Sequence, residues 1–384
     1  MTSHKMVKTI AQISSTSGDA EEIKISINGK EIFFRTAKFI NPSCDFAIWA
    51  TLPIAMRQGG ILQIQGTTSK AARDNAERIS IIWSTWLPKK FKPIRVTSDG
   101  FLDAEPSMGA KSLMLYSGGV DSTFALKRYV EEGHEKPDVL TIHGMDYQQS
   151  DKAKFERLKK RTADFRAKYS DESIEVISNA ASTMRRFGVA SDIGHGFQLF
   201  ATLFLFDATH NIGLIAADYT VPQDYLTIPW GTNSLTNALF YGTRMHIKTL
   251  SNDVTRGEKL RQLHSDDLAL KTLSFCKNYS VRPDNCGTCT KCVRTKAMFH
   301  AAGLTVPDIF RIKGYHAEDL KFIDLSKSSE IAFCLDILAM AREAGTLSDF
   351  QMIADHIFEN RRPSKFQRIM KKGEAYFRGA KTNG

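Results

Sequence analysis

The feature of the sequence that most constrains its fold is an alternation of short apolar runs with helix-like segments between residues 112 and 217. The apolar runs, each of strand length, lie at 112–116, 139–142, 174–177 and 213–217. The segments of helical length and pattern between them lie at 122–132, 151–168 and 197–209. Strands that are apolar on both faces belong to a parallel sheet covered by helices on both sides. The sequence therefore predicts an α/β fold whose ligands bind at the carboxyl ends of the strands.

The first apolar run leads directly into Ser117-Gly118-Gly119-Val120-Asp121-Ser122 and then into a helix. Two consecutive glycines allow a tight turn that presents backbone amides to an anion, and the helix start adds partial positive charge. The hydroxyls of Ser117 and Ser122 can donate to phosphate oxygens. The carboxylate of Asp121 would repel phosphate unless a cation such as Mg²⁺ lies beside it, or it can accept hydrogen bonds from the loop amides. The turn predicts a phosphate-binding loop, although glycines in such turns can also be purely steric.

This loop differs from two common phosphate-binding motifs. No Gly-Lys-Ser or Gly-Lys-Thr follows it, so it is not the P-loop of kinase-like nucleotidases, and the third glycine of a dinucleotide fingerprint is missing.

Four of the six cysteines are clustered as C-x9-C-x2-C-x2-C. They are Cys276, Cys286, Cys289 and Cys292. Four thiolates at this spacing suit a closed tetrahedral zinc site of structural type, with an iron-sulfur cluster as the alternative. The other two cysteines, Cys44 and Cys334, are isolated and are expected to be buried hydrophobic side chains.

With these two motifs the chain resembles the PP-loop ATP pyrophosphatase superfamily, whose members carry Ser-Gly-Gly-x-Asp-Ser after the first strand of a Rossmann-like sheet of the adenine nucleotide alpha-hydrolase type. The cysteine pattern, a trailing Arg294 and the run 297–303 narrow the resemblance to the 7-cyano-7-deazaguanine synthase (QueC) family over about residues 110–303. The resemblance implies a loop that grips the pyrophosphate of ATP with Mg²⁺ while a substrate oxygen attacks the α-phosphorus. An amine then displaces AMP from the adenylated acid.

The expected site residues follow from the loop and the resemblance. Those expected to bind ATP are Leu115, Tyr116, Ser117, Gly118, Gly119, Val120, Asp121, Ser122 and Thr123, of which Ser117, Asp121 and Ser122 are expected to be catalytic. Those expected to contact the substrate are Tyr147, Gln148 and Asp218.

Alternatives stay open for several of these residues. The segment 145–149 matches the family's Asp-Tyr-Gly-Gln only loosely, and a plain surface turn also explains it. A helix cap also explains Asp218. The pair Arg256 and Lys259 favours an exposed charged helix face over phosphate contact. Two histidines, His143 and His195, are expected to be satisfied locally and are assigned no role.

The chain divides into four expected regions. An α+β module at 1–106 precedes the ATP-binding domain at 110–275, a zinc knuckle at 276–303 and a helical region with a basic tail at 304–384. Within the module the sequence predicts a hairpin turning at Asn28-Gly29, a strand at 61–65 and a helix from Ser69. The segment 98–107 is expected to be a linker, and 329–344 and 348–360 to be helices.

Charge and hydropathy indicate which partners and which cellular location to expect. The net charge of +10 is concentrated after residue 360, where a basic tail could meet nucleic acid or an acidic protein, or could be a solvated helix. No run approaches the roughly 20 apolar residues of a membrane span. We therefore expect a cytoplasmic protein with no membrane partner.

The leading functional expectation is a ligase that adenylates a deazaguanine-type carboxylate or carbonyl and passes it to an amine, which is ammonia or a partner protein's amine. The added N-terminal module and tail resemble QueC-like proteins of bacterial antiviral defence operons, including the Qat type. Two alternatives remain, a tRNA-thiolating enzyme of the same superfamily and a non-catalytic ATP-binding module of a complex.

Overall fold

The computed structural model describes residues 7–16, 21–37, 42–102 and 111–359. Its centre is one mostly parallel sheet of ten strands, ordered β10-β9-β6-β7-β8-β3-β2-β1-β4-β5. The strands are β1 (Lys8–Thr16), β2 (Glu21–Ile27), β3 (Lys30–Thr36), β4 (Gly60–Thr68), β5 (Ile94–Phe101), β6 (Ser112–Leu115), β7 (Asp138–His143), β8 (Ser173–Ser178), β9 (Ile212–Ala216) and β10 (His246–Leu250). The predicted α/β class and parallel pairing of the four apolar runs are confirmed.

Both faces of the central strands are buried, as their composition predicts. Along β6, Leu113 and Leu115 face a hydrophobic core that contains α6, whereas Met114 faces a second core that contains α3. The helices that follow the central strands are α3 (Val120–Glu131), α4 (Lys152–Tyr169), α5 (Ala180–Arg186), α6 (Ser191–Phe204) and α7 (Val221–Thr227). The chain moves outward from β6 through β7 to β8 and then returns to β9 on the other side of β6. A crevice is expected where the direction of winding changes.

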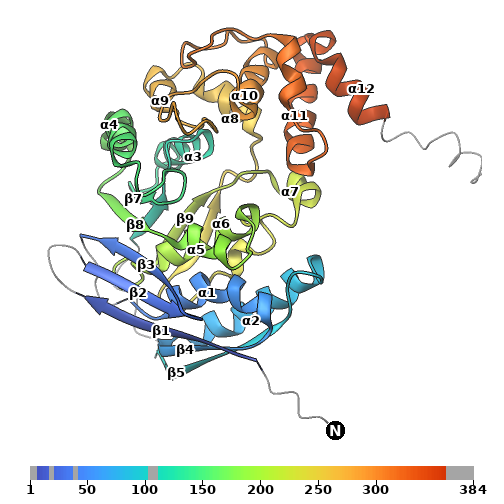
Figure 1. Cartoon of the computed structure of the whole chain (residues 1–384). Helices are drawn as coiled ribbons and strands as arrows, with labels where there is room; N and C mark the ends of the chain where they lie inside the picture. The colour runs from blue at the N-terminus through green and yellow to red at the C-terminus, as the bar shows by residue number, and fades with distance from the viewer. Residues whose placement is uncertain (1–6, 17–20, 38–41, 103–110, 360–384) are drawn as a thin grey trace, which may run out of the picture.

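The N-terminal strands extend the same sheet. Strand β3 pairs antiparallel with β8 through Phe34↔Ser178 and Arg35↔Ile177. The predicted hairpin is confirmed, because Asn28 and Gly29 join β2 to β3 with φ of 48° and 72°. The expected boundary near residue 106 lies in 103–110, outside the described residues, but the strands before and after it belong to one sheet (Figure 1).

Part of the expected linker is instead a strand. Ser98 pairs with Ile64 and Gly100 with Thr67, so the segment belongs to β5 and not to a linker. Polar residues suit this edge strand because one of its faces is open to solvent.

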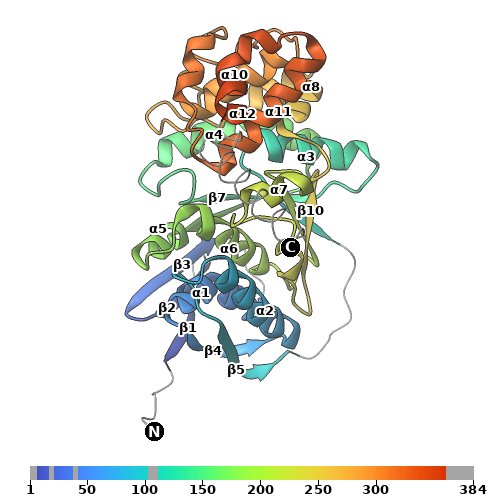
Figure 2. The ribbon, with the colours of Figure 1, turned by 90° about the vertical axis from the view of Figure 1, so that its right-hand side faces the viewer.

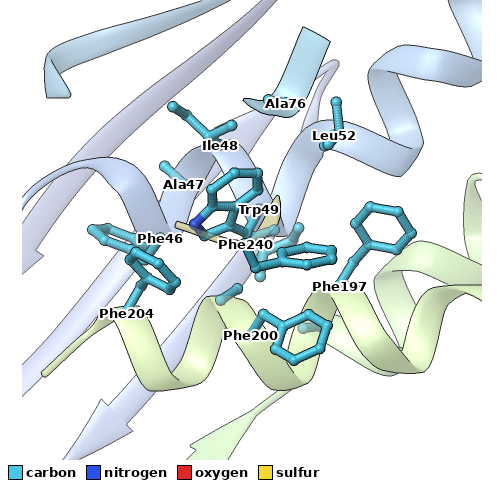
Figure 3. Packing of buried hydrophobic residues seen from close by; sticks show 14 of the residues in the cluster. Phe46, Ala47, Ile48, Trp49, Leu52, Ala76, Phe197, Phe200, Phe204 and Phe240 are labelled. Atoms are coloured by element: carbon cyan, nitrogen blue, oxygen red, sulfur yellow. The ribbon is translucent and has the colours of Figure 1, made fainter. Parts of the chain in front are cut away.

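Two helices of the N-terminal region, α1 (Asp45–Gln58) and α2 (Lys70–Trp86), cover one face of its strands. Helix α1 also packs along α6, and Trp49 lies with its ring centroid 5.7 Å from that of Phe204 and 5.0 Å from that of Phe240 (Figure 3). The N-terminal and central strands therefore share a hydrophobic core as well as a sheet.

The remaining helices gather at the end of the molecule opposite the N-terminal strands (Figures 1 and 2). They are α8 (Arg256–Leu263), α9 (Asp267–Thr272), α10 (Thr290–Ala301), α11 (Ser328–Ala344) and α12 (Gln351–Glu359), with the short 3-10 turns η2 (Ala317–Phe322) and η3 (Leu347–Phe350). The 3-10 turn η1 (Asn237–Leu239) lies elsewhere, against α2 and β10. The predicted C-terminal helices are confirmed as α11 and as η3 with α12. The basic tail from residue 360 lies outside the described residues.

Within the part of the chain that the structure describes, every helix is too short or too polar to traverse a lipid bilayer.

Candidate functional site

Two adjoining cavities open at the carboxyl ends of β6, β7 and β9, where the topology places a crevice. The larger has a volume of about 670 Å³ and a wall that is apolar on one side, with Ile142, Met184 and Leu199. The smaller has a volume of about 170 Å³. Both are lined by Ser117 and Gly119 of the predicted phosphate loop, so the loop lies where they meet.

Half of the residues that line the smaller cavity are charged. Its cations are Arg256, Arg282, Lys291 and Arg294, and its carboxylates are Asp121, Asp146 and Asp218. The buried ammonium of Lys259 adds a further positive charge beside Asp121. Positive charge therefore exceeds negative charge around this space, which suits a polyanionic ligand.

The loop has the tight geometry that its glycines predict. Gly118 has φ of +71°, and a Cβ there would lie 3.0 Å from Cγ2 of Thr162. Its carbonyl accepts a hydrogen bond of 2.8 Å from the amide of Ser274, which ties the loop to the segment before the cysteines. A side chain at 118 would force this packing apart.

Helix α3 begins in the loop without a cap. Its first helical hydrogen bond runs from the Thr123 amide to the Gly119 carbonyl (3.0 Å), so three amides lie ahead of it. Among the described residues, no side chain caps this end. The hydroxyl of Ser122 donates within the loop to the Gly119 carbonyl (3.3 Å) and lies 3.3 Å from the Ser117 hydroxyl. Uncapped amides and two hydroxyls beside cations form an anion-binding end of the helix.

Asp121 is paired with two cations of the protein. Its carboxylate accepts hydrogen bonds from the guanidinium of Arg256 and from Nζ of Lys259 (3.1 Å). Burial acts to raise the pKa of Asp121, but the charges and hydrogen bonds of Arg256 and Lys259 outweigh burial and lower it. The three groups together carry a net positive charge. A cation beside Asp121 was expected, and the protein itself supplies two.

The expectation of an exposed charged face at Arg256 and Lys259 is wrong. Lys259 is 0 % exposed, and its ammonium also donates to the carbonyl of Ala217 (2.7 Å). The guanidinium of Arg256 lies 4.5 Å from the ring centroid of Phe333 on α11. Packing of α8 against α3 and α11 turns this face inward.

Most of the nine residues expected to bind ATP face the cavities. Those that line one or both cavities are Leu115, Tyr116, Ser117, Gly119, Val120, Asp121 and Ser122. The other two lie behind the loop. Gly118 is turned toward α4, and Thr123 is buried with its hydroxyl 3.5 Å from that of Tyr116.

The two neighbours Tyr147 and Gln148 differ. Tyr147 is buried, lines both cavities and has its hydroxyl 3.1 Å from that of Ser274. Burial raises the pKa of Tyr147. The side chain of Gln148 is exposed and lines neither cavity, while its carbonyl lies 2.9 Å from Nε2 of His143. The structure therefore brings Tyr147 to the site and leaves Gln148 outside it.

Asp218 lines both cavities and does not cap a helix. The cap of α7 is Thr220, which forms a capping box with Gln223. The carboxylate of Asp218 accepts hydrogen bonds from the Trp230 indole (2.9 Å) and the Thr232 hydroxyl (2.8 Å). His195 lines the larger cavity, with its Nε2 3.2 Å from the same hydroxyl.

The four clustered cysteines meet in space. Their sulfur atoms all lie within 4.8 Å of one another, and the distances from Cys276 to Cys289 and from Cys286 to Cys292 are 3.8 and 3.9 Å. Tetrahedral zinc with bonds of about 2.3 Å places thiolates about 3.8 Å apart. Backbone amides donate to these sulfurs, as thiolate ligands require. These cysteines could hold a metal ion such as zinc. Of the two isolated cysteines, Cys334 is fully buried and Cys44 half-buried.

The cysteine cluster is built into the wall of the smaller cavity. Cys289 is the N-cap residue of α10, whose first turns carry Lys291 and Arg294 toward the cavity. Arg294 is paired with Glu330 (2.8 Å) and stacked on Phe333, while its Nε is buried without a partner. A metal ion held by the cysteines would fix the start of this helix.

Three cations that line the smaller cavity, namely Arg282, Lys291 and Arg294, carry no site assignment from the sequence. Lys291 and Arg294 share a helix face three residues apart, a spacing that could have been noticed beside the cysteines. Arg282 stands in an irregular segment and has no such pattern. It reaches the site because its guanidinium donates to the carbonyls of Cys276 and Asp146.

Comparisons with protein-family models, curated proteins and solved structures give no match to the chain.

Proposed function

We propose that the chain is an ATP-dependent ligase of the QueC-like PP-loop type, which adenylates an organic acid and releases pyrophosphate. The observation that carries the proposal is the uncapped start of α3, with its Ser-Gly-Gly-x-Asp-Ser loop, facing a small cavity lined by four cations. Strand order supports the Rossmann-like assignment, since the strands from β8 to β10 follow the order 3-2-1-4-5 when numbered from β6.

The two cavities suit the two parts of ATP. The smaller cavity would take the β- and γ-phosphates, whose charge matches Arg256 and Arg294. The larger cavity has both the volume and the apolar wall for the adenosine and the acid. The α-phosphorus would then lie where the cavities meet, beside Ser117.

In the proposed reaction a carboxylate oxygen of the acid forms a bond to the α-phosphorus. The bond between that phosphorus and the bridging oxygen breaks, and pyrophosphate leaves with the electron pair. Loop amides and neighbouring cations stabilise the charge that develops on the leaving group. A magnesium ion accompanying the nucleotide would supply further positive charge, and Asp121 and Asp218 face the space where it would lie. An amine then attacks the acyl carbon and AMP departs.

The finer assignments rest on the family resemblance. We propose a deazaguanine-type acid as substrate, ammonia or an amine of a partner defence protein as acceptor, and a cytoplasmic location. For the cysteine cluster we propose structural zinc. Elemental analysis that finds iron with a visible charge-transfer band, and no zinc, would overturn the zinc assignment.

A thiolating enzyme is less well supported. Sulfur transfer generally uses a free cysteine or an open cluster iron near the loop. None of the six cysteines, all of which lie in the described part of the chain, lines either cavity.

Pyrophosphate release tests the proposal. Purified, metal-loaded protein is incubated with ATP, Mg²⁺ and a panel of acids that includes deazaguanine carboxylates. We expect release that depends on the acid. Binding of ATP without release across the panel would favour a non-catalytic module. Thiolated tRNA formed from ATP and a sulfur donor would favour the alternative enzyme.

A further inference from the structure

Lys291 differs from the other cations that line the smaller cavity. It lies in the first turn of α10 and lines both the larger and the smaller cavity. No hydrogen bond or ion pair joins its ammonium to any residue that the structure describes. A half-buried ammonium without a partner is costly unless a ligand completes its contacts.

The neighbouring cations are already held by the protein. Arg256 is bound to Asp121, and Arg294 to Glu330. Arg282, which also lines both cavities, donates to two backbone carbonyls. Of the two cations that line both cavities, Lys291 is therefore the one without a partner among the described residues. Arg185 and Lys277 also have none, but they line the larger cavity alone.

The surrounding chain fixes the position of Lys291 in advance. Cys289 and Cys292, which would hold the metal ion, flank it in the sequence. Residues 291, 294 and 295 share one face of α10 and reach the cavities together. A cation held in place before the reaction costs no reorganisation when charge develops.

We propose that Lys291 is a catalytic residue whose ammonium contacts the α-phosphate and the attacking carboxylate oxygen. This inference rests on the proposed function. In the proposed step the ammonium donates hydrogen bonds and transfers no proton. It brings two anions together and stabilises the extra negative charge on the equatorial oxygens while the new phosphorus–oxygen bond forms and the bond to pyrophosphate breaks. Other groups hold the β- and γ-phosphates, so Lys291 adds little to the binding of ATP itself. Its contribution is greatest in the transition state, where charge builds up on the α-phosphate.

The test separates binding from turnover. In Lys291→Met the rate constant for acid-dependent pyrophosphate release should fall about 100-fold to 1,000-fold. The dissociation constant for ATP, measured by calorimetry, should change less than about threefold, because the loop and arginines remain. Lys291→Arg should recover part of the rate. Elemental analysis should find the same metal content in all variants.

A matched control lies on the same helix. Lys296 is buried and lines neither cavity, and its one hydrogen bond within the described residues is to the carbonyl of Ile312. Lys296→Met should change pyrophosphate release by less than about threefold. An N-acylsulfamoyl adenosine, in which the acid is joined to 5′-O-sulfamoyladenosine as a stable mimic of the adenylated acid, gives a second measurement that needs no turnover. Lys291→Met should weaken its binding more than tenfold while ATP binding is retained.

Two results would overturn the role of Lys291 without touching the proposed function. One is wild-type turnover that Lys291→Met leaves unchanged. The other is binding of both ATP and the mimic that Lys291→Met weakens equally or not at all. Failure of the wild-type protein to bind ATP would instead remove the proposed function and this inference together.

Discussion

Two strand-to-helix turns in the same sheet have opposite chemistry. After β4, the helix α2 is capped by Ser69, whose hydroxyl accepts from the amide of Ala72 (3.1 Å). Asp45 accepts from both the amide and the hydroxyl of Ser69, at 2.7 and 2.6 Å. After β6, the helix α3 has no side-chain cap and faces a cavity. A helix start at the carboxyl end of a strand is available to a ligand only where the protein leaves it uncapped.

The carboxylates beside these turns, the buried Asp45 and the partly buried Asp121, differ in the same way. Burial raises the pKa of Asp45 to about 6, because its partners are uncharged donors of Ser69. The pKa of Asp121 is lowered, because Arg256 and Lys259 outweigh the effect of burial. The first turn is a closed structural element and the second is a charged site. Four experiments test this contrast.

The largest expected effect is that of Asp121→Ala. This change leaves the fully buried Lys259 without its carboxylate. Breaking a buried ion pair on one side costs about 3–5 kcal/mol. We expect a decrease of that size in the free energy of unfolding, measured with denaturant, and loss of pyrophosphate release. The variant Asp121→Asn keeps the shape of the side chain and should lose less stability than Asp121→Ala. Unchanged stability in Asp121→Ala would mean that the pairing seen here does not hold the site together.

Removal of the metal ion proposed for the cysteine cluster should have the next largest effect. The loop after β6 is tied to Ser274, two residues before Cys276 of the cysteine cluster. The turn after β4 is tied instead to Cys44, whose amide donates to the carbonyl of Thr67. We expect chelation to lower pyrophosphate release at least about 100-fold. Trp230 lies in the cavity wall, and the chain's three other tryptophans lie in the N-terminal region. Chelation should therefore change the fluorescence of Trp230 and leave that of the other three unchanged. This fluorescence change on chelation should be absent in Trp230→Phe. Metal-free protein with full activity would contradict this dependence.

The pH dependence of stability should reveal Asp45. Its folded-state pKa of about 6 lies above the ordinary 3.8, so its contribution is fully present below about pH 4 and is lost as pH rises through 6. Burial also raises the pKa of Asp207, which acts in the same direction. We expect Asp45 to lower the free energy of unfolding by about 2 kcal/mol between pH 4 and 7. Asp45→Asn should flatten this slope in denaturant titrations, and an equal slope in both proteins would refute the assignment.

The smallest effect distinguishes two adjacent residues. Gln148→Ala should change pyrophosphate release by less than about twofold, because an exposed side chain outside the cavities is replaced. Tyr147→Phe removes the hydroxyl that lies 3.1 Å from that of Ser274, and should slow release about fivefold to tenfold. The steady-state rate of pyrophosphate release at saturating ATP measures the effect of both substitutions. A larger loss in Gln148→Ala than in Tyr147→Phe would reverse the placement of the two residues.

The sequence predicted those parts of the fold that depend on residues close together in the chain. The apolar runs of the central sheet, the Asn28-Gly29 hairpin and the cysteine cluster all follow from spacing along the chain. Helix α1 escaped prediction because it is buried on nearly every side between the sheet and α6, so it has no polar face. The strand β5 escaped because its polar residues stand on an open face.

The partners of the site could not be predicted for a different reason. The contacts from Arg256 and Lys259 to Asp121 span 135 and 138 residues. Only the packing of α8 beside α3 brings these groups together. The loop is therefore visible in the sequence, whereas the charges that surround it emerge only from the fold.

The central claim is that the turn after β6 binds the phosphates of ATP, and calorimetry tests it most directly. Folded, metal-loaded protein is titrated with ATP and Mg²⁺, and then with ATP in the presence of pyrophosphate. We predict one site per chain with a dissociation constant between about 1 μM and 1 mM, and competition by pyrophosphate. Absence of binding at millimolar ATP would contradict the account.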